Sequence, residues 1–231
     1  MLTPASIQAT SPSPTADLFV DDLRGTLTEL LARLTPEATL RPDDPKLDLQ
    51  ALLRAALKNE LEATEIAARW IPLTDDPEIK LALARQVGDE SRHYRLIRER
   101  LSELGADLTG LNPLAKGFSP LFNYLNQLTD TVERVAAGQF AREGIALVKN
   151  AQFIDLCEAR GDAKTAALYR DTINPDERHH HELGEKLLRR LATTPEAQRR
   201  AREAVAGTLK LAEELQSLAL DKLGLHHAPG C

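Results

Sequence analysis

The chain of 231 residues is 42% hydrophobic and 28% charged, as globular proteins are, and has a formal net charge of -6. The negative charge and the lack of a basic stripe argue against a general nucleic-acid partner, and no apolar run reaches the roughly 18 residues of a membrane span. The first residues lack the basic and apolar regions of a secretory signal. Cys157 and the C-terminal Cys231 do not suggest a disulfide framework, so we expect a cytoplasmic protein.

Helix-forming residues dominate, and apolar residues recur every three or four positions, which predicts an all-α chain. Residues 1–16, rich in Ser, Thr and Pro, are expected to form a disordered or extended tail. A single helical domain is expected over 17–224, and a C-terminal tail over 225–231.

The helices expected in chain order cover 17–34, 47–71, 77–104, a short piece within the connection that follows, 130–160, 163–191 and 195–224. Asp76 and Pro77 suit the start of a helix, and Asp130 with Glu133 forms a capping-box pattern. Pro175 should kink its helix. The pattern predicts two hairpins, 47–104 and 130–191, joined by a long crossover.

Two short stretches share one arrangement of charged residues. Residues 89–93 read DESRH and residues 176–180 read DERHH, so each has an Asp, then a Glu, then a His three positions after the Glu. On a helix, positions i and i+3 lie on one face. The two side chains of each pair, Glu90 with His93 and Glu177 with His180, can therefore bind the same ion or molecule. Bundle sites for two metals add one Glu from each of the other two helices.

The two further glutamates are chosen by helix face. Glu60 shares the apolar stripe of its helix, whereas Glu62 and Glu65 align with solvent-facing residues. Glu143 shares an apolar face, whereas Glu133 is explained as a cap partner. At about 1.5 Å per residue, the two carboxylates chosen in each hairpin lie at nearly one level.

The expected ligands are Glu60, Glu90, His93, Glu143, Glu177 and His180. Four buried carboxylates would repel one another, and two divalent cations would offset their charge. Carboxylate and imidazole ligands suit iron or manganese. Asp89 and Asp176 are expected to accept the free N–H of the His of the opposite pair.

These residues resemble the ferritin-like superfamily and, more narrowly, its oxygen-activating di-iron carboxylate enzymes. DESRH matches the Asp-Glu-x-Arg-His pattern of the bacterial multicomponent monooxygenase hydroxylases, which is related to that of the ribonucleotide reductase small subunit, and DERHH departs from it at His179. The resemblance covers about residues 47–191. Ile97 stands where the reductase has its radical tyrosine, and Leu147 stands where the hydroxylases have a threonine.

The resemblance implies a ferritin-like four-helix bundle with a long crossover and extra N- and C-terminal helices. It implies two iron ions, or a manganese or mixed pair, in an oxidoreductase that activates dioxygen to oxidise an apolar small-molecule substrate held in a channel. A separate electron donor and a homodimer are expected with it.

Two other functions stay open from the sequence. One is a ferroxidase or peroxide-scavenging iron-handling protein, and the other is a non-catalytic bundle stabilised by metal. Four further residues have open roles: His181 as a ligand or a surface residue, Gln139 as a partner of a bound oxygen species or a core amide, and Tyr94 and Tyr169 as cavity lining or core.

Overall fold

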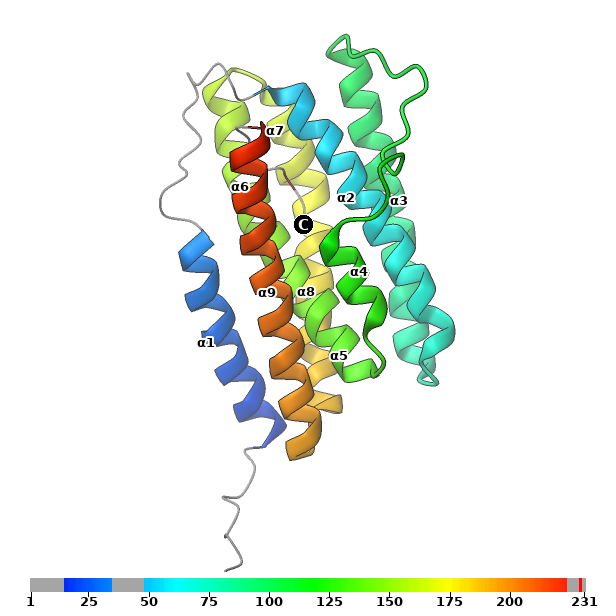
Figure 1. The fold of residues 1–231 in the computed structure, drawn as a ribbon, viewed down its shortest axis with the longest axis vertical. Coiled ribbons are helices and arrows are strands. Elements are labelled where there is room, and N and C mark those ends of the chain that lie inside the picture. The colour runs from blue at the N-terminus through cyan, green and yellow to red at the C-terminus, as the bar shows by residue number, and fades with distance from the viewer. Residues whose placement is uncertain (1–14, 35–47, 224–228, 230–231) are drawn as a thin grey trace, which may run out of the picture.

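The computed structural model describes residues 15–34, 48–223 and Pro229. Within those ranges the chain is helical and contains no strand, which confirms the all-α prediction (Figure 1). The helices are α1 (Ala16–Leu34), α2 (Leu49–Trp70), η1 (Ile71–Leu73), α3 (Pro77–Glu103), α4 (Pro120–Gln127), α5 (Thr131–Val135), η2 (Ala136–Arg142), α6 (Glu143–Ala159), α7 (Ala163–Leu168), η3 (Tyr169–Ile173), α8 (Asn174–Leu191) and α9 (Pro195–Leu223). The predicted tails, except for residues 15, 16 and 229, and the predicted helix end at Gly224 lie outside the described residues.

Local chemistry explains where the helices begin and end. The carboxylate of Asp76 accepts hydrogen bonds from the backbone N–H groups of Glu78 and Ile79, which would otherwise lack partners in the first turn of α3. Asp130 and Glu133 form the predicted capping box at the start of α5. Gly161 takes a φ of +76° between α6 and α7, a backbone conformation that favours glycine.

Two long helices contain π-helical segments. The segment η2 lies between α5 and α6, and η3 lies between α7 and α8, in each case without a break in the helix. Pro175 follows η3 closely and has no backbone N–H for the carbonyl of Asp171, so the regular α-helical hydrogen bonding is interrupted there. The irregularity expected at Pro175 is thus present as the π-helical turn η3. The other π-helical segment, η2, was not predicted from the sequence.

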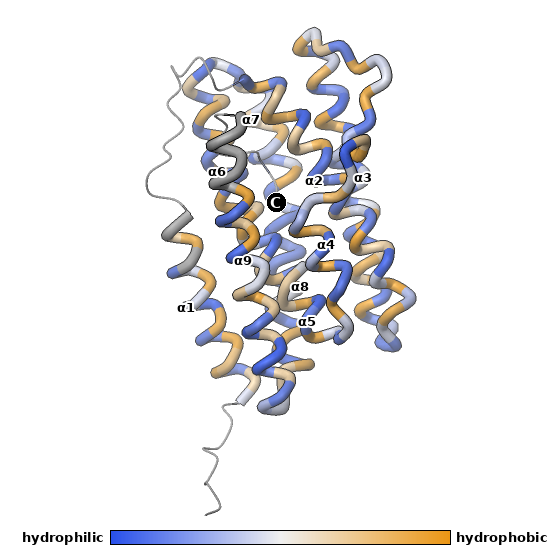
Figure 2. Tube along the Cα trace, in the orientation of Figure 1, coloured by the Kyte–Doolittle hydropathy of each residue, from blue (hydrophilic) through white to orange (hydrophobic). Residues whose placement is uncertain are grey.

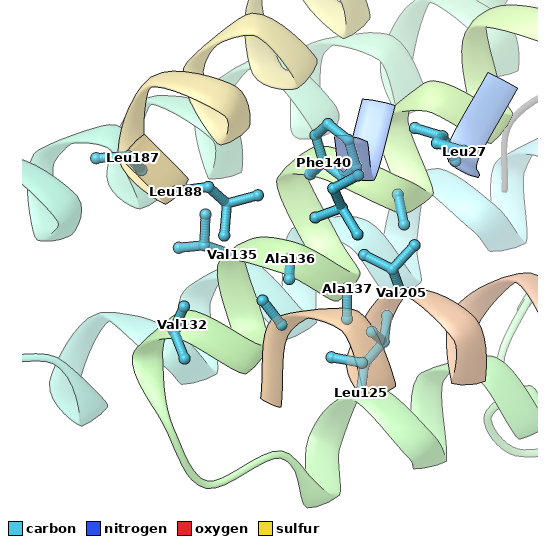
Figure 3. Packing of buried hydrophobic residues seen from close by; sticks show 14 of the residues in the cluster. Leu27, Leu125, Val132, Val135, Ala136, Ala137, Phe140, Leu187, Leu188 and Val205 are labelled. Atoms are coloured by element: carbon cyan, nitrogen blue, oxygen red, sulfur yellow. The ribbon is translucent and has the colours of Figure 1, made fainter. Parts of the chain in front are cut away.

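The helices enclose two apolar clusters. The α2–α3 hairpin runs along one side of the molecule, and α1 and α9 run along the other (Figure 1). The first cluster gathers side chains from α1, α4, α5, η2, α8 and α9, including Leu27, Leu125, Phe140, Leu188 and Val205 (Figure 3). The second joins α2, α3, α6, α7 and η3 and includes Leu53, Ile97, Phe153, Tyr169 and Ile173.

A buried charged layer separates the two clusters. On α2, for example, Glu60 stands between Leu57 of the second cluster and Ile66 of the first. Apolar and polar stretches alternate at short intervals along the helices (Figure 2). No helix in the described ranges is both long and apolar enough to cross a lipid bilayer.

We predict that Gly184→Ala lowers the free energy of unfolding by about 1–3 kcal/mol. Helix α8 packs so close to η2 that a Cβ at position 184 would lie 2.7 Å from the backbone N of Phe140 and 2.8 Å from the backbone carbonyl carbon of Gln139. Gly88→Ala is the matched control, because position 88 is on the exposed face of α3 and its Cβ would meet nothing within 4 Å. This substitution should stabilise the helix by up to about 1 kcal/mol. Urea unfolding of both variants measures this, and equal effects would contradict the close packing.

Candidate metal centre

Six ionisable side chains converge in the layer between the apolar clusters. They form two overlapping groups, Glu60–Glu90–His93–Glu177 and Glu90–Glu143–Glu177–His180, and in each group one ligand atom per residue lies within 4.8 Å of the others. All six residues are between 0% and 3% exposed. The groups share Glu90 and Glu177, so each has one further Glu and one His of its own. The structure therefore brings together all six side chains that were expected as ligands, in two groups that share Glu90 and Glu177.

The unpartnered atoms of the cluster fit metal ions. Nδ1 of His93, Nδ1 of His180, Oε2 of Glu60 and Oε2 of Glu177 are buried without a hydrogen-bond partner. His93 Nδ1 lies 3.4 Å from Glu60 Oε2 and 3.5 Å from Glu177 Oε1. Two atoms bound about 2.1 Å from one cation are separated by roughly 3–3.5 Å. These atoms are costly to bury unless a cation or a shared proton lies between them.

The other nitrogen of each histidine faces an aspartate of the opposite helix. His93 Nε2 lies 3.0 Å from Asp176 Oδ2, and His180 Nε2 lies 3.2 Å from Asp89 Oδ2. Arg92 pairs with Asp176, and Arg85 Nε lies 3.4 Å from Asp89 Oδ2. A carboxylate acceptor favours the tautomer with hydrogen on Nε2, which leaves the lone pair of Nδ1 directed at the cluster.

Two side chains that the sequence did not single out hold the carboxylates. The amide of Gln86 donates from Nε2 to Glu143 Oε1 at 2.7 Å and to Glu90 Oε1 at 3.3 Å. Arg142, 6% exposed, donates to Glu143 Oε1 at 3.3 Å. Gln139 donates to Gln86 Oε1 at 2.8 Å. The spacing of Gln86, one turn before Glu90, was the available signal.

The remaining singled-out residues lie elsewhere. His181 is directed away from the cluster, with Nδ1 2.7 Å from the backbone oxygen of Phe140 and its ring stacked on the Phe140 ring. Tyr94 is half-buried against the second apolar cluster. Tyr169 is fully buried in that cluster, and its hydroxyl has no hydrogen-bond partner.

The pKa values of the clustered side chains indicate that positive charge stabilises the cluster. Burial raises the pKa of Glu60 to about 7, and burial together with the charges of Glu90 and Glu143 raises the pKa of Glu177 well above its ordinary value. Burial alone would lower the pKa of His93, but the facing carboxylates of Glu60 and Glu90 outweigh it and raise that pKa to about 12. Without metal, protons supply the compensating charge.

Comparisons with known proteins identify the fold. No protein-family model matches the sequence, and no curated protein matches it. The chain is similar to the X-ray structure of a TenA homologue from Pyrococcus furiosus, with a TM-score of 0.60, 16% sequence identity, and coverage of 84% of this chain and 95% of that one. At this identity the likeness shows the fold, which is TenA-like.

This finding corrects the ferritin-like resemblance and the function taken from it. The expected ferritin-like bundle, and with it the dioxygen-activating di-iron oxidoreductase and its two alternatives, rested on the Asp-Glu-x-x-His spacing. That spacing places a Glu and a His on one face of any helix. It does not determine how helices connect and pack, and in this chain they do so as in the TenA homologue. The reaction therefore cannot be carried over from the motif.

We predict that metal uptake at pH 7 releases at least one proton per chain. Because the pKa of His93 is raised to about 12 in the metal-free protein, the imidazole carries a proton on each nitrogen at pH 7, and a cation must displace the proton on Nδ1. Apparent metal affinity should therefore rise with pH, most clearly through the pKa of Glu60, about 7. Isothermal titration calorimetry in buffers of different ionisation enthalpy measures the proton count, and heats independent of the buffer would contradict this reading.

Proposed function

We propose that the chain is a metalloenzyme whose buried centre binds two divalent cations, with iron or manganese as the metals. The observation that carries the proposal is the pair of unpartnered Nδ1 atoms, each directed at a group of buried carboxylates. An apolar side chain at any of the six positions would be less costly to bury.

The ligand set favours the choice of metals. The cluster offers carboxylate oxygen and imidazole nitrogen, and the buried thiol of Cys157 belongs to the second apolar cluster. Oxygen and nitrogen ligands without thiolate suit iron and manganese. Four ionised carboxylates also match the charge of two divalent cations, so the bound centre would be close to neutral.

Coordination number supports an enzyme rather than a structural metal site. Each group supplies four residues, of which Glu90 and Glu177 serve both. Cations that prefer about six ligands would keep positions for small exogenous molecules. When bound, the pair supplies Lewis-acid chemistry that polarises such a ligand. The chain would bind and bridge the cations, hold both imidazoles through Asp89 and Asp176, and exclude water with the apolar clusters on either side.

We predict that Glu143→Gln reduces the metal content from two ions per chain to one. The variant removes the charge of a carboxylate that serves one centre only and keeps its shape. Glu62→Gln is the matched control, because Glu62 is also buried on the helix that carries Glu60 but accepts hydrogen bonds from Ser119. Elemental analysis after dialysis gives the metal count. Two ions in both variants would show that Glu143 is not a ligand.

A second prediction concerns the aspartate behind His93. Asp176→Ala should weaken metal binding about 10–100-fold, because the imidazole loses the acceptor that orients it. Asp171→Ala, an exposed aspartate of the same long helix that pairs with Arg170, should leave the affinity unchanged. Competition with a chromophoric chelator measures both, and equal affinities would argue against a role for Asp176.

A further inference from the structure

Tyr169 has a hydroxyl group whose burial the fold alone does not explain. The side chain is completely buried, and its hydroxyl oxygen has no hydrogen-bond partner. By contrast, the hydroxyl of Tyr124 donates to the backbone oxygen of Ala204 at 3.2 Å. An unsatisfied buried hydroxyl costs about 1–3 kcal/mol, so a phenylalanine would be more stable here. Such a group suggests a hydrogen-bond acceptor that is not part of the protein.

The helix geometry places Tyr169 on the same face of its helix as Glu177. Tyr169 is the first residue of η3 and precedes Glu177 by eight positions on one long helix. In a regular α-helix, residues eight positions apart lie on different faces. Because a π-turn takes up one extra residue, Tyr169 and Glu177 are related as residues i and i+7 of a regular helix are. Residues at i and i+7 share a face.

The surroundings of the phenol agree with this direction. Its ring packs edge-on against Phe153, with centroids 4.9 Å apart, and so is held by the second apolar cluster. Burial, and next the negative charge of Glu60, raise the pKa of Tyr169 well above its ordinary value, and Glu177 contributes in the same direction. Neither carboxylate accepts a hydrogen bond from the hydroxyl.

We propose that the Tyr169 hydroxyl donates a hydrogen bond to a small anionic or oxygen ligand, of the size of hydroxide or azide, bound to the metal pair beside Glu60 and Glu177. The inference rests on the proposed metal centre. A ligand held by cations has lone pairs to accept this bond, and a donor fixed in an apolar wall stabilises negative charge without reorganisation. Tyr169 is thus a residue that positions and selects the exogenous ligand.

The test uses azide and the variant Tyr169→Phe, which removes only the hydroxyl. Tyr124→Phe, on α4, is the matched control. All three proteins are freed of metal, loaded with cobalt(II), analysed for metal, and titrated with azide while the visible absorption of the bound cobalt is followed. We expect two cobalt ions per chain in each. Azide affinity should fall about tenfold or more in Tyr169→Phe and stay within about twofold of the wild type in Tyr124→Phe.

A thermal melt of the metal-free proteins supplies a readout that does not depend on metal. Tyr169→Phe should melt at the wild-type temperature or above it, because no hydrogen bond is lost. Wild-type azide affinity in Tyr169→Phe, loss of cobalt from it, or a lower melting temperature would each overturn the proposal. Failure of the wild type itself to bind cobalt would reject the metal centre and this inference with it, and the metal analysis distinguishes that case from the azide result.

Discussion

The mutual repulsion of four buried carboxylates is the constraint on which the rest of this structure depends. Glu60, Glu90, Glu143 and Glu177 come from α2, α3, α6 and α8 and meet where two apolar clusters face each other. Such a cluster is stable only with positive charge inside it, supplied either by protons or by cations. The raised pKa values of Glu60 and Glu177 indicate that protons can compensate the negative charge. The unpartnered Nδ1 atoms of His93 and His180 indicate that cations can do so instead. In the proposed metal centre, cations and protons would therefore compete for the same site.

The surroundings of the cluster are built to hold it in place. Each imidazole is fixed from behind by an aspartate of the opposite helix, and each aspartate is paired with an arginine at the surface. The π-helical segments lie next to two of the proposed ligands, η2 directly before Glu143 and η3 shortly before Glu177. A widened turn costs regular hydrogen bonding, and such turns occur frequently at functional sites. By the helix geometry argued above, the extra residue of η3 places Tyr169 on the face of its helix that carries Glu177.

Much of this could be predicted from the sequence, and the reason is that the successful predictions rest on local rules. Helix starts follow from caps such as Asp130 with Glu133, and the pairs Glu90–His93 and Glu177–His180 follow from the i, i+3 geometry of a helix. The fold family could not be predicted in this way, because a helix face does not specify connectivity. The ferritin-like expectation was wrong for that reason, and the TenA-like fold became visible only when whole architectures were compared. The roles of Gln86 and Arg142 depend on contacts between helices, and the face of Tyr169 depends on a π-turn for which the sequence shows no periodic signal.

The most direct test of the central claim is a crystal structure of the protein loaded with manganese or iron, with anomalous diffraction measured at the absorption edge of that metal. The account predicts two anomalous peaks in the buried layer. One should lie between Glu60 and His93, the other between Glu143 and His180, and Glu90 and Glu177 should contact both. A buried layer without anomalous peaks, while these six side chains stay in place, would contradict it.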